Sequence, residues 1–399
     1  MRKLLLWILC IGLLALGGCG GRTEEEITAE PVPEETPVPT RDPGEAEPLY
    51  LQWYQDNASP SLPDIAAANA YGEDRIKEAA ALAIDAPYIR DISFLKDCTS
   101  LTCLILYCDA LTDLSPLAEL PLSLLNLSIS GEADLSPLAE LPLVNLEIAS
   151  DSLRELSPLA GLRELKSLSL QGGSITDISV LSGFPGLRTL ELHCPEIDSL
   201  APLSGMTELT TLSVYSAHDL DISPLLGLPL TELALICQSF DPAALAGMNG
   251  LKKLTLETSD TAALEIAGAL PLEDLTLSLS QGPDSLYFLK NGGTVTRLSL
   301  TLPGSFRDVS ALAAYIRLES LYINIGDGSV DLSPLSGFTS LTALSVIGAE
   351  IVSAESLASC KALVFAYLMS DNLSVEQIES LRDALPGATV EADSYSWAG

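Results

Sequence analysis

Cysteine and histidine have the most versatile side-chain chemistry in this sequence, but their spacing predicts no metal site and no catalytic nucleophile. The 399-residue chain has eight cysteines and two histidines, His193 and His218. Zinc sites need Cys or His ligands in close, paired spacing, and neither histidine lies in such a cluster. The chain also lacks G-x-S-x-G, H-E-x-x-H, P-loop and dinucleotide-binding motifs. We therefore expect no enzyme activity, no bound metal ion and no cofactor.

Acidic residues dominate the charge of the chain. It has 54 Asp and Glu against 20 Lys and Arg, which gives a formal net charge of -34. So few basic residues cannot neutralise nucleic-acid phosphates, and anionic lipid would repel the protein. The hydrophobic fraction of 47% is too high for a disordered acidic protein. The composition therefore indicates a folded protein that binds neither nucleic acid nor a membrane surface through charge.

The N-terminus has the pattern of an export signal that ends at a cysteine. Arg2 and Lys3 precede an apolar run over residues 4–16, and Gly17-Gly18-Cys19 follows. The run is roughly a dozen residues, shorter than the ~20 that a membrane-spanning helix needs. This arrangement resembles the lipobox of bacterial lipoproteins, which implies that residues 1–18 are a signal peptide and that Cys19 carries a lipid. An uncleaved anchor helix is the alternative.

Residues 19–48 are predicted to be a tether that begins with the lipid-bearing Cys19. Residues 22–48 are rich in proline and glutamate and nearly lack large apolar side chains. Such a segment cannot bury enough surface to offset the entropy lost on ordering. We interpret it as a disordered spacer rather than as a binding motif.

A short motif recurs through the rest of the chain, and most successive starts are 20 to 24 residues apart. Asp-Leu-Ser-Pro-Leu occurs at residues 113–117, 134–138 and 331–335, and close variants begin at Glu155 and Asp221. A period near 22 residues is typical of one coil of a solenoid. The repeated aspartate predicts a turn or a short-helix cap rather than a catalytic carboxylate.

Each motif is followed, about ten residues later, by an L-x-x-L-x-L pattern such as Leu165, Leu168 and Leu170. The alternating leucines predict a short strand with one buried face. One coil cannot bury these leucines alone, but stacked coils bring the strands together in a long parallel sheet at a spacing of about 4.8 Å. One coil fits two registers, Leu122/Leu125/Leu127 and Leu124/Leu127/Ile129.

This pattern resembles the leucine-rich repeats of bacterial internalins. The resemblance implies an α/β repeat solenoid, a horseshoe or arc whose long parallel sheet lies on the concave face, with about 13 coils over residues 79–372. The family usually has asparagine three residues after the last strand leucine, where the amide satisfies backbone groups. Here that position holds other residues, among them Asp109, Gly173 and Pro195. The coils are therefore expected to stack less regularly than in internalins.

Both ends of the array are predicted to carry helical caps. In residues 49–78, Ser61-Leu62-Pro63-Asp64 indicates a helix start, and an amphipathic stretch continues to about Glu78. In residues 373–399, a helix is expected to begin at Ser374 and to run to Ala384. Caps cover the open ends of a solenoid and keep it soluble.

The repeat argues against disulfides among the six cysteines that follow Cys19. Cys98 and Cys360 take a position that leucine fills in other coils, which predicts burial as apolar side chains. Cys108, Cys194 and Cys237 fall in coils that are not adjacent, so they are too far apart for a bridge. Cys103 and Cys108 share one coil, and this pair stays open.

The resemblance implies that residues flanking the buried strand leucines face the concave side, where the family commonly binds its partner. Tyrosine is favoured at interfaces, yet sheet propensity alone also selects Thr, Ser and Tyr, and both explanations stay open. For Phe365 and Tyr367, packing under the C-terminal cap is the favoured explanation. The candidate binding residues are Tyr107, Glu191, His193, Tyr215, Lys253, Glu257, Tyr322, Asn324, Phe365 and Tyr367.

These patterns together predict a non-enzymatic binding module of the bacterial cell envelope. It would be exported, anchored to the membrane only through the lipid on Cys19, and monomeric. Its concave face would bind a protein or glycan partner, because solenoids offer extended surfaces rather than pockets. The alternative is an envelope spacer or assembly factor without a specific ligand, in which the array serves as a rigid acidic rod.

Overall fold

The computed structural model describes residues 48–55, 59–289 and 293–393, within a compact unit that spans residues 42–399. The predicted signal peptide, Cys19 and nearly all of the predicted tether lie outside the described residues. In the described part of the chain, no helix is long and apolar enough to cross a membrane.

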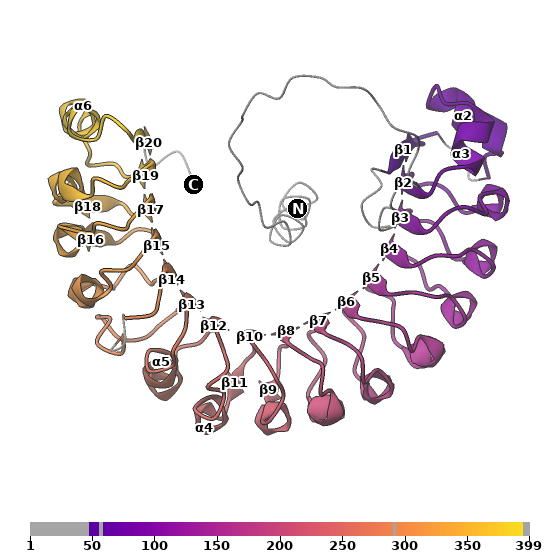
Figure 1. Cartoon of the computed structure of the whole chain (residues 1–399), viewed down its shortest axis with the longest axis horizontal. Coiled ribbons are helices and arrows are strands. Elements are labelled where there is room, and N and C mark those ends of the chain that lie inside the picture. Colours follow the sequence, from indigo (N-terminus) through magenta and orange to yellow (C-terminus); the bar gives the residue numbers. More distant parts are fainter. Residues whose placement is uncertain (1–47, 56–58, 290–292, 394–399) are drawn as a thin grey trace, which may run out of the picture. The chain divides into compact units, whose positions relative to one another are not determined.

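One strand from each coil joins a single parallel sheet of 16 strands, which pair in chain order along the concave side of the unit (Figure 1). Fourteen of them (16 minus β1 and β20) lie within residues 79–372, against about 13 predicted coils. The strands are β1 Leu49–Gln52, β2 Ala81–Asp85, β3 Cys103–Tyr107, β4 Leu124–Ser128, β5 Asn145–Ala149, β6 Ser167–Gln171, β7 Thr189–His193, β8 Thr211–Tyr215, β10 Glu232–Ile236, β12 Lys253–Glu257, β13 Asp274–Ser278, β14 Arg297–Thr301, β15 Ser320–Asn324, β17 Ala343–Ile347, β19 Phe365–Met369 and β20 Thr389–Asp393.

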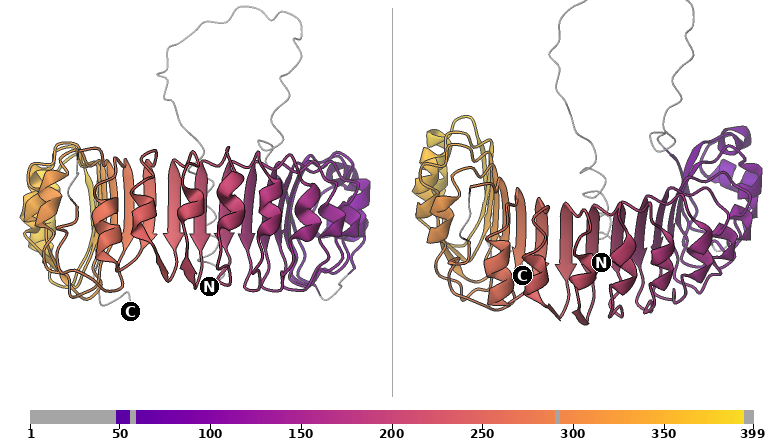
Figure 2. Two further views of the ribbon diagram at one scale, coloured as in Figure 1. Left: turned by 90° about the horizontal axis from the view of Figure 1, so that it is seen from below. Right: turned by 60° about the horizontal axis from the view of Figure 1, so that its bottom comes forward.

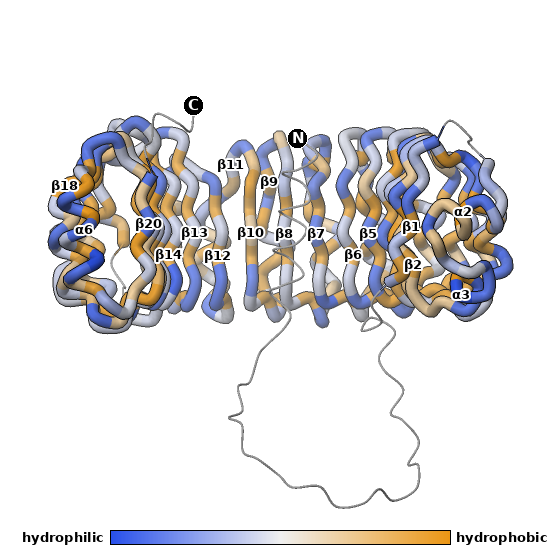
Figure 3. The backbone as a smooth tube through the Cα atoms, turned by 90° about the horizontal axis from the view of Figure 1, so that it is seen from above, coloured by the Kyte–Doolittle hydropathy of each residue, from blue (hydrophilic) through white to orange (hydrophobic). Residues whose placement is uncertain are grey.

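Most strands alternate buried and accessible residues, as the leucine spacing predicts. Figure 3 shows the hydropathy of the residues along the strands. In β6, for example, Leu168 and Leu170 are fully buried, and the residues between and beside them face the other side of the sheet. In the ambiguous coil, Leu125 and Leu127 pair with Leu104 and Leu106 of the preceding strand. The Leu122/Leu125/Leu127 register is therefore correct.

Short helices cover the opposite, convex side of the sheet (Figures 1 and 2). Most are 3-10 helices of three to six residues, in which the leucine of Ser-Pro-Leu points into the core. Two coils have the α-helices α4 Pro242–Leu245 and α5 Thr261–Ala267 instead, and two small sheets join β9 Asp219–Leu220 to β11 Ser239–Phe240 and β16 Ser329–Asp331 to β18 Glu350–Val352. The 3-10 helices are Ser93–Asp97, Ser115–Leu117, Ser136–Leu138, Ser157–Gly161, Ser179–Gly183, Ala201–Gly205, Ser223–Leu225, Ser310–Ala314, Ser333–Leu335 and Ala354–Ser359.

The motif aspartates hold the turns before these helices, as predicted. Asp221 accepts hydrogen bonds from the backbone N–H of Ser223 at 2.8 Å and from its hydroxyl at 2.9 Å. The same N–H to carboxylate bond recurs in the coils of Asp113, Asp134, Asp177 and others. These hydrogen bonds from serine hydroxyls and backbone N–H groups lower the pKa of the aspartates.

This shift predicts a loss of stability in acid. A lowered folded-state pKa means that the carboxylate stabilises the fold fully above its unfolded-state value near 3.8, and that this contribution disappears as pH falls through the lower folded value. We expect the triple variant Asp134→Asn, Asp177→Asn and Asp221→Asn to melt at a lower temperature at neutral pH. Below about pH 4 its midpoint should fall less steeply than that of the unmodified protein, because the asparagine oxygen does not titrate. Thermal unfolding followed by circular dichroism at several pH values measures both effects, and parallel pH profiles would contradict the expectation.

The N-terminal cap differs from the expected continuous helical stretch. A capping box at Ser61 begins helix α2, Leu62–Ala68, but the helix stops at Asn69, and a second helix, α3, covers Glu73–Lys77. Ala70 between them has a positive φ of 57°. The predicted helical region also contains strand β1, which extends the sheet beyond the first repeat.

Asn69 joins the end of α2 to strand β1. Its side-chain oxygen accepts from the Gln52 N–H at 2.7 Å, and its amide nitrogen donates to the Gln52 carbonyl at 3.1 Å. The next N–H along the chain, at Trp53, donates to the Asp85 carbonyl of β2 at 3.1 Å, so the Gln52 groups point to the outer edge. The end of α2 therefore closes the exposed edge of the sheet, where another chain could otherwise add a strand.

The C-terminal cap has the same design. Helix α6, Val375–Ala384, begins at the Ser374 capping box as predicted, and strand β20, which was not predicted, follows it. Arg382 of α6 donates two hydrogen bonds, at 2.9 and 3.1 Å, to the carbonyl of Val390 in β20. Both terminal strands of the sheet are thus protected by side chains of the adjoining helices.

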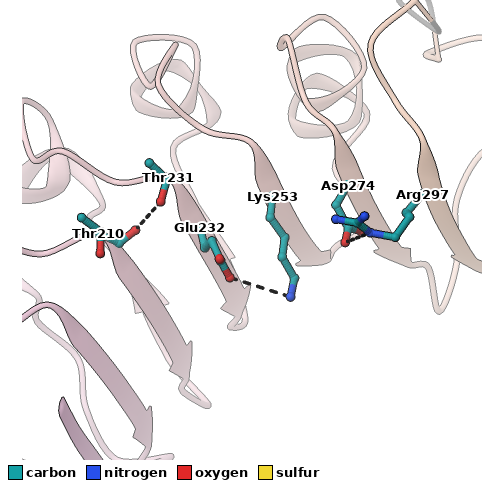
Figure 4. Close-up of polar contacts among 6 residues, drawn as sticks. All are labelled: Thr210, Thr231, Glu232, Lys253, Asp274 and Arg297. Atoms are coloured by element: carbon teal, nitrogen blue, oxygen red, sulfur yellow. Dashed lines mark hydrogen bonds and ion pairs between the residues drawn. The ribbon is translucent and has the colours of Figure 1, made fainter. Parts of the chain in front are cut away.

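Hydrogen bonds continue between neighbouring coils at both ends of the strands, although the asparagines are missing. After most strands, the next N–H donates to the last carbonyl of the following strand, for example from Ser150 to Gln171 at 2.8 Å. Before the strands, hydroxyls bridge to the preceding coil, as Thr231 does to the Thr210 carbonyl at 3.2 Å (Figure 4). The expectation of looser stacking is wrong for the sheet, whose register continues without a bulge between the described strands. The irregularity falls on the convex side instead.

Candidate binding surface

Positions 1, 3 and 5 of the five-residue strands face the concave side and form three rows across the sheet, which we name the first, middle and last rows. All ten residues predicted for the concave face lie in these rows. The first row contains Lys253 and Phe365, the middle row contains Glu191, Tyr322 and Tyr367, and the last row contains Tyr107, His193, Tyr215, Glu257 and Asn324.

Charges of alternating sign follow one another in the central part of the first row (Figure 4). Glu232, Lys253, Asp274 and Arg297 are successive partners in the register of β10, β12, β13 and β14. Lys253 Nζ lies 3.8 Å from Glu232 Oε2, and Arg297 Nε lies 3.0 Å from Asp274 Oδ2. Exposed pairs of this kind add little stability. Their effect is to leave no unpaired cation at the centre of this row.

An aromatic pair stands in the last row. The rings of His193 and Tyr215 are stacked, with centroids 6.3 Å apart and an angle of 17° between their planes. Tyr215 is 40% exposed, although a tyrosine that served only the core would be covered. The pair therefore offers a flat, accessible surface to a ligand.

The N-terminal part of the face carries a cluster that the sequence analysis missed. The hydroxyls of Tyr50 and Tyr54 both donate to Asp85 Oδ2, at 2.9 and 2.7 Å. Hydrogen bonding to the Asp85 carboxylate raises the pKa of Tyr54 to about 12, so the phenol remains a donor at neutral pH. Tyr107 lies directly beside Asp85 in the register of β2 and β3. The cluster thus combines aromatic rings with one carboxylate.

Two further carboxylates lie in the middle row. Glu147 accepts a hydrogen bond from Asn126 Nδ2 at 2.6 Å, and Glu191 accepts one from Ser169 Oγ at 3.2 Å. Ser169 is the register partner of both glutamates, so the two stand two strands apart. Burial raises the pKa of Glu147, and the negative charge of Glu191 adds to the shift.

The C-terminal aromatics do not pack under the cap as expected. Helix α6 lies on the convex side (Figure 1), and Phe365 is 39% exposed on the concave side. Tyr367 contacts the cap only through β20, where its hydroxyl donates to Asp393 Oδ2 at 3.0 Å. Asn324 accepts from the Gly326 N–H at 3.0 Å, so its amide serves a turn.

The cysteines give no reactive centre. All six described cysteines are free thiols, and Cys98 and Cys360 are fully buried as predicted. The open pair, Cys103 and Cys108, is not bridged, and burial raises the pKa of Cys108 to about 12. No group of three or more His, Cys, Asp or Glu among the described residues could hold a metal ion.

Comparison with known proteins gives the fold a name. No family model matches the sequence, and no curated protein matches it. Among solved structures, a leucine-rich-repeat protein of Leptospira interrogans aligns over 88% of this chain and 97% of its own, at a TM-score of 0.55 and 16% identity. The fold is a leucine-rich-repeat solenoid. The predicted fold class is confirmed.

An internalin of Listeria monocytogenes, InlF, is similar to this leucine-rich-repeat chain at 24% identity. The match covers 72% of this chain and 84% of the internalin, with a TM-score of 0.48.

Proposed function

We propose that this protein is a binding module that recognises a protein partner through the concave face of its solenoid. The observation that carries the proposal is the exposed His193–Tyr215 stack, which projects from the last row without a structural role in the core. Solenoids offer extended concave surfaces, and aromatic residues dominate the energetics of interfaces. Export and a lipid anchor on Cys19, predicted from the first 19 residues, would place this surface at the bacterial envelope.

A comparison of two double variants tests the proposal. The bait is the compact unit of residues 42–399, offered to the bacterium's own envelope fraction and to host extracellular proteins. His193→Ala with Tyr215→Ala removes the stack. Tyr88→Ala with Tyr287→Ala is the matched control, because these tyrosines are 54% and 48% exposed but lie outside the three rows. We expect the first pair to weaken capture of the partner about tenfold or more, and the control pair to change it less than about twofold.

The other outcomes separate the alternatives. A captured partner that is equally sensitive to both double variants would place the site elsewhere on the solenoid. A glycan that competes for the native bait would replace the protein partner. Failure to retain anything at low and at physiological salt would favour a spacer without a specific ligand.

A further inference from the structure

The N-terminal half of the concave face is acidic and contains no lysine or arginine. In strands β1 to β8, whose residues are all described, the three rows hold the carboxylates of Asp85, Glu147 and Glu191 and no Lys or Arg side chain. The central part of the first row differs, because Lys253 and Arg297 there pair with acidic neighbours. Charge is therefore balanced along the central part of the first row and unbalanced toward the N-terminal end of the face.

Asp85 forms the first of two places where a cation fits. Both tyrosine hydroxyls bind Oδ2, and Oδ1 of the same carboxylate receives neither bond. No Lys, Arg or His of the described residues forms an ion pair with Asp85. Tyr50 and Tyr54 are 45% and 54% exposed, so their rings are accessible beside the carboxylate. Aromatic faces and a carboxylate together bind an organic cation through charge and cation–π attraction.

Glu147 and Glu191 form the second place. They flank Ser169 in the middle row, with one strand between them, and neither has a cationic partner among the described residues. Asn126 and Ser169 already donate to them, which fixes the two carboxylates in place. Glu147 is held toward Asn126 of β4 and Glu191 toward Ser169 of β6. A cationic side chain between the two carboxylates would be attracted by both, and it would offset the like-charge repulsion that contributes to the raised pKa of Glu147.

We propose that the N-terminal half of the concave face binds an extended, basic segment of the partner protein, with one cationic side chain on Asp85 and a second between Glu147 and Glu191. The proposal rests on the protein-binding function proposed above and gives the partner's chemistry. Asp85 in β2 and Ser169 in β6 are four strand spacings apart, about 19 Å, which equals roughly six residues of extended chain at about 3.3 Å per residue. The two basic residues should therefore be about six positions apart.

A bare metal ion fits this surface less well than a peptide does. Calcium needs six to eight oxygen ligands, whereas Asp85 is a single carboxylate surrounded by phenol groups, and no metal-binding cluster exists among the described residues. Charge complementarity thus favours an organic cation on a peptide chain.

Peptides of defined spacing test the proposal on the 42–399 unit. The probe is an acetylated and amidated 12-residue Ser/Gly/Ala peptide with arginine at positions 3 and 9. The control peptide has the same composition and charge, with arginine at positions 3 and 4. Isothermal titration at low salt should show at least about fivefold tighter binding of the spaced peptide, since only it reaches both places. Equal affinity for the two peptides would overturn the proposal, because it would indicate non-specific attraction to an acidic protein.

Variants assign the two places separately. Asp85→Asn, and Glu147→Gln with Glu191→Gln, should each weaken binding of the spaced peptide about tenfold, the usual size of a lost charge-assisted hydrogen bond. Glu119→Gln with Glu140→Gln removes two charges, as the Glu147 and Glu191 pair of substitutions does, but from exposed positions outside the three rows, and should change binding less than about twofold. Thermal melting confirms that each variant is folded, and the two places provide independent tests.

The results also separate this inference from the proposed function. Equal loss of binding in the concave and control variants would overturn the inference, as would absence of peptide binding at low salt. If a partner is nevertheless captured through the His193–Tyr215 stack, the binding function stands and only the basic chemistry of the partner is wrong.

Discussion

Gly161→Ala should lower the free energy of unfolding by about 3 kcal/mol, an unusually large cost for one methyl group. Gly161 ends the 3-10 helix Ser157–Gly161 on the convex side, and a Cβ there would lie 2.3 Å from the carbonyl oxygen of Ala139 in the preceding coil. That oxygen belongs to the backbone and cannot rotate away. The coil-to-coil spacing must therefore widen locally, which strains packing on both sides.

Two other glycines provide a matched control for this prediction. Gly183 and Gly205 end the equivalent helices of the next two coils, and no atom of a neighbouring coil lies within 4 Å of a Cβ built on either. Alanine at these positions should stabilise the protein by up to about 0.5 kcal/mol, because it reduces the freedom of the unfolded chain. Urea unfolding followed by circular dichroism measures all three variants. Similar midpoints for the three would show that the contact between the coils of Ala139 and Gly161 is not tight.

The repeated part of the fold could be predicted from the sequence because the same residue pattern occurs in many successive coils. Alternating leucines gave the strands, and Ser-Pro-Leu after aspartate gave the turns. The missed elements are the two small convex-side sheets within the repeat and the strands of the two caps outside it. Strand β1 depends on pairing with β2, and the stop after α2 depends on Asn69, whose partner Gln52 is 17 residues away. Such contacts occur once and do not repeat along the sequence, so its periodicity cannot predict them.

The concave rows were predictable for the same reason, but the groupings within them were not. Lys253 was identified by its strand position, whereas its neighbour Glu232 was missed although Leu233 and Leu235 mark the same pattern. Tyr50 and Tyr54 precede the first repeat, so alternation could not assign them to the face. The cluster of Asp85 with Tyr50 and Tyr54 forms only when the chain folds, because the tyrosines are 35 and 31 residues from Asp85 in the sequence.

Removal of the C-terminal cap should be far more damaging than removal of an internal coil. A chain that ends at Ser370 lacks α6 and β20, and with them the buried side chains of Ile378, Leu381 and Val390. The deletion exposes the apolar end of the last coil and leaves the outer edge of β19 without its partner. We expect mostly aggregated protein, and a melting midpoint more than about 10 °C lower for any soluble fraction.

An in-frame deletion of residues 167–188 is the control for cap removal. It joins Lys166 to Thr189 and removes one complete coil, because Lys166 and Arg188 occupy equivalent positions before successive strands. The stability of a solenoid is approximately a sum over coils and the contacts between neighbours, so the shortened array keeps both caps and loses only one increment. It should remain monomeric in size-exclusion chromatography and melt within a few degrees of the full chain. If instead the cap deletion stays monomeric while the coil deletion aggregates, stability depends on the identity of individual coils, and the end contacts of Asn69 and Arg382 have a minor role.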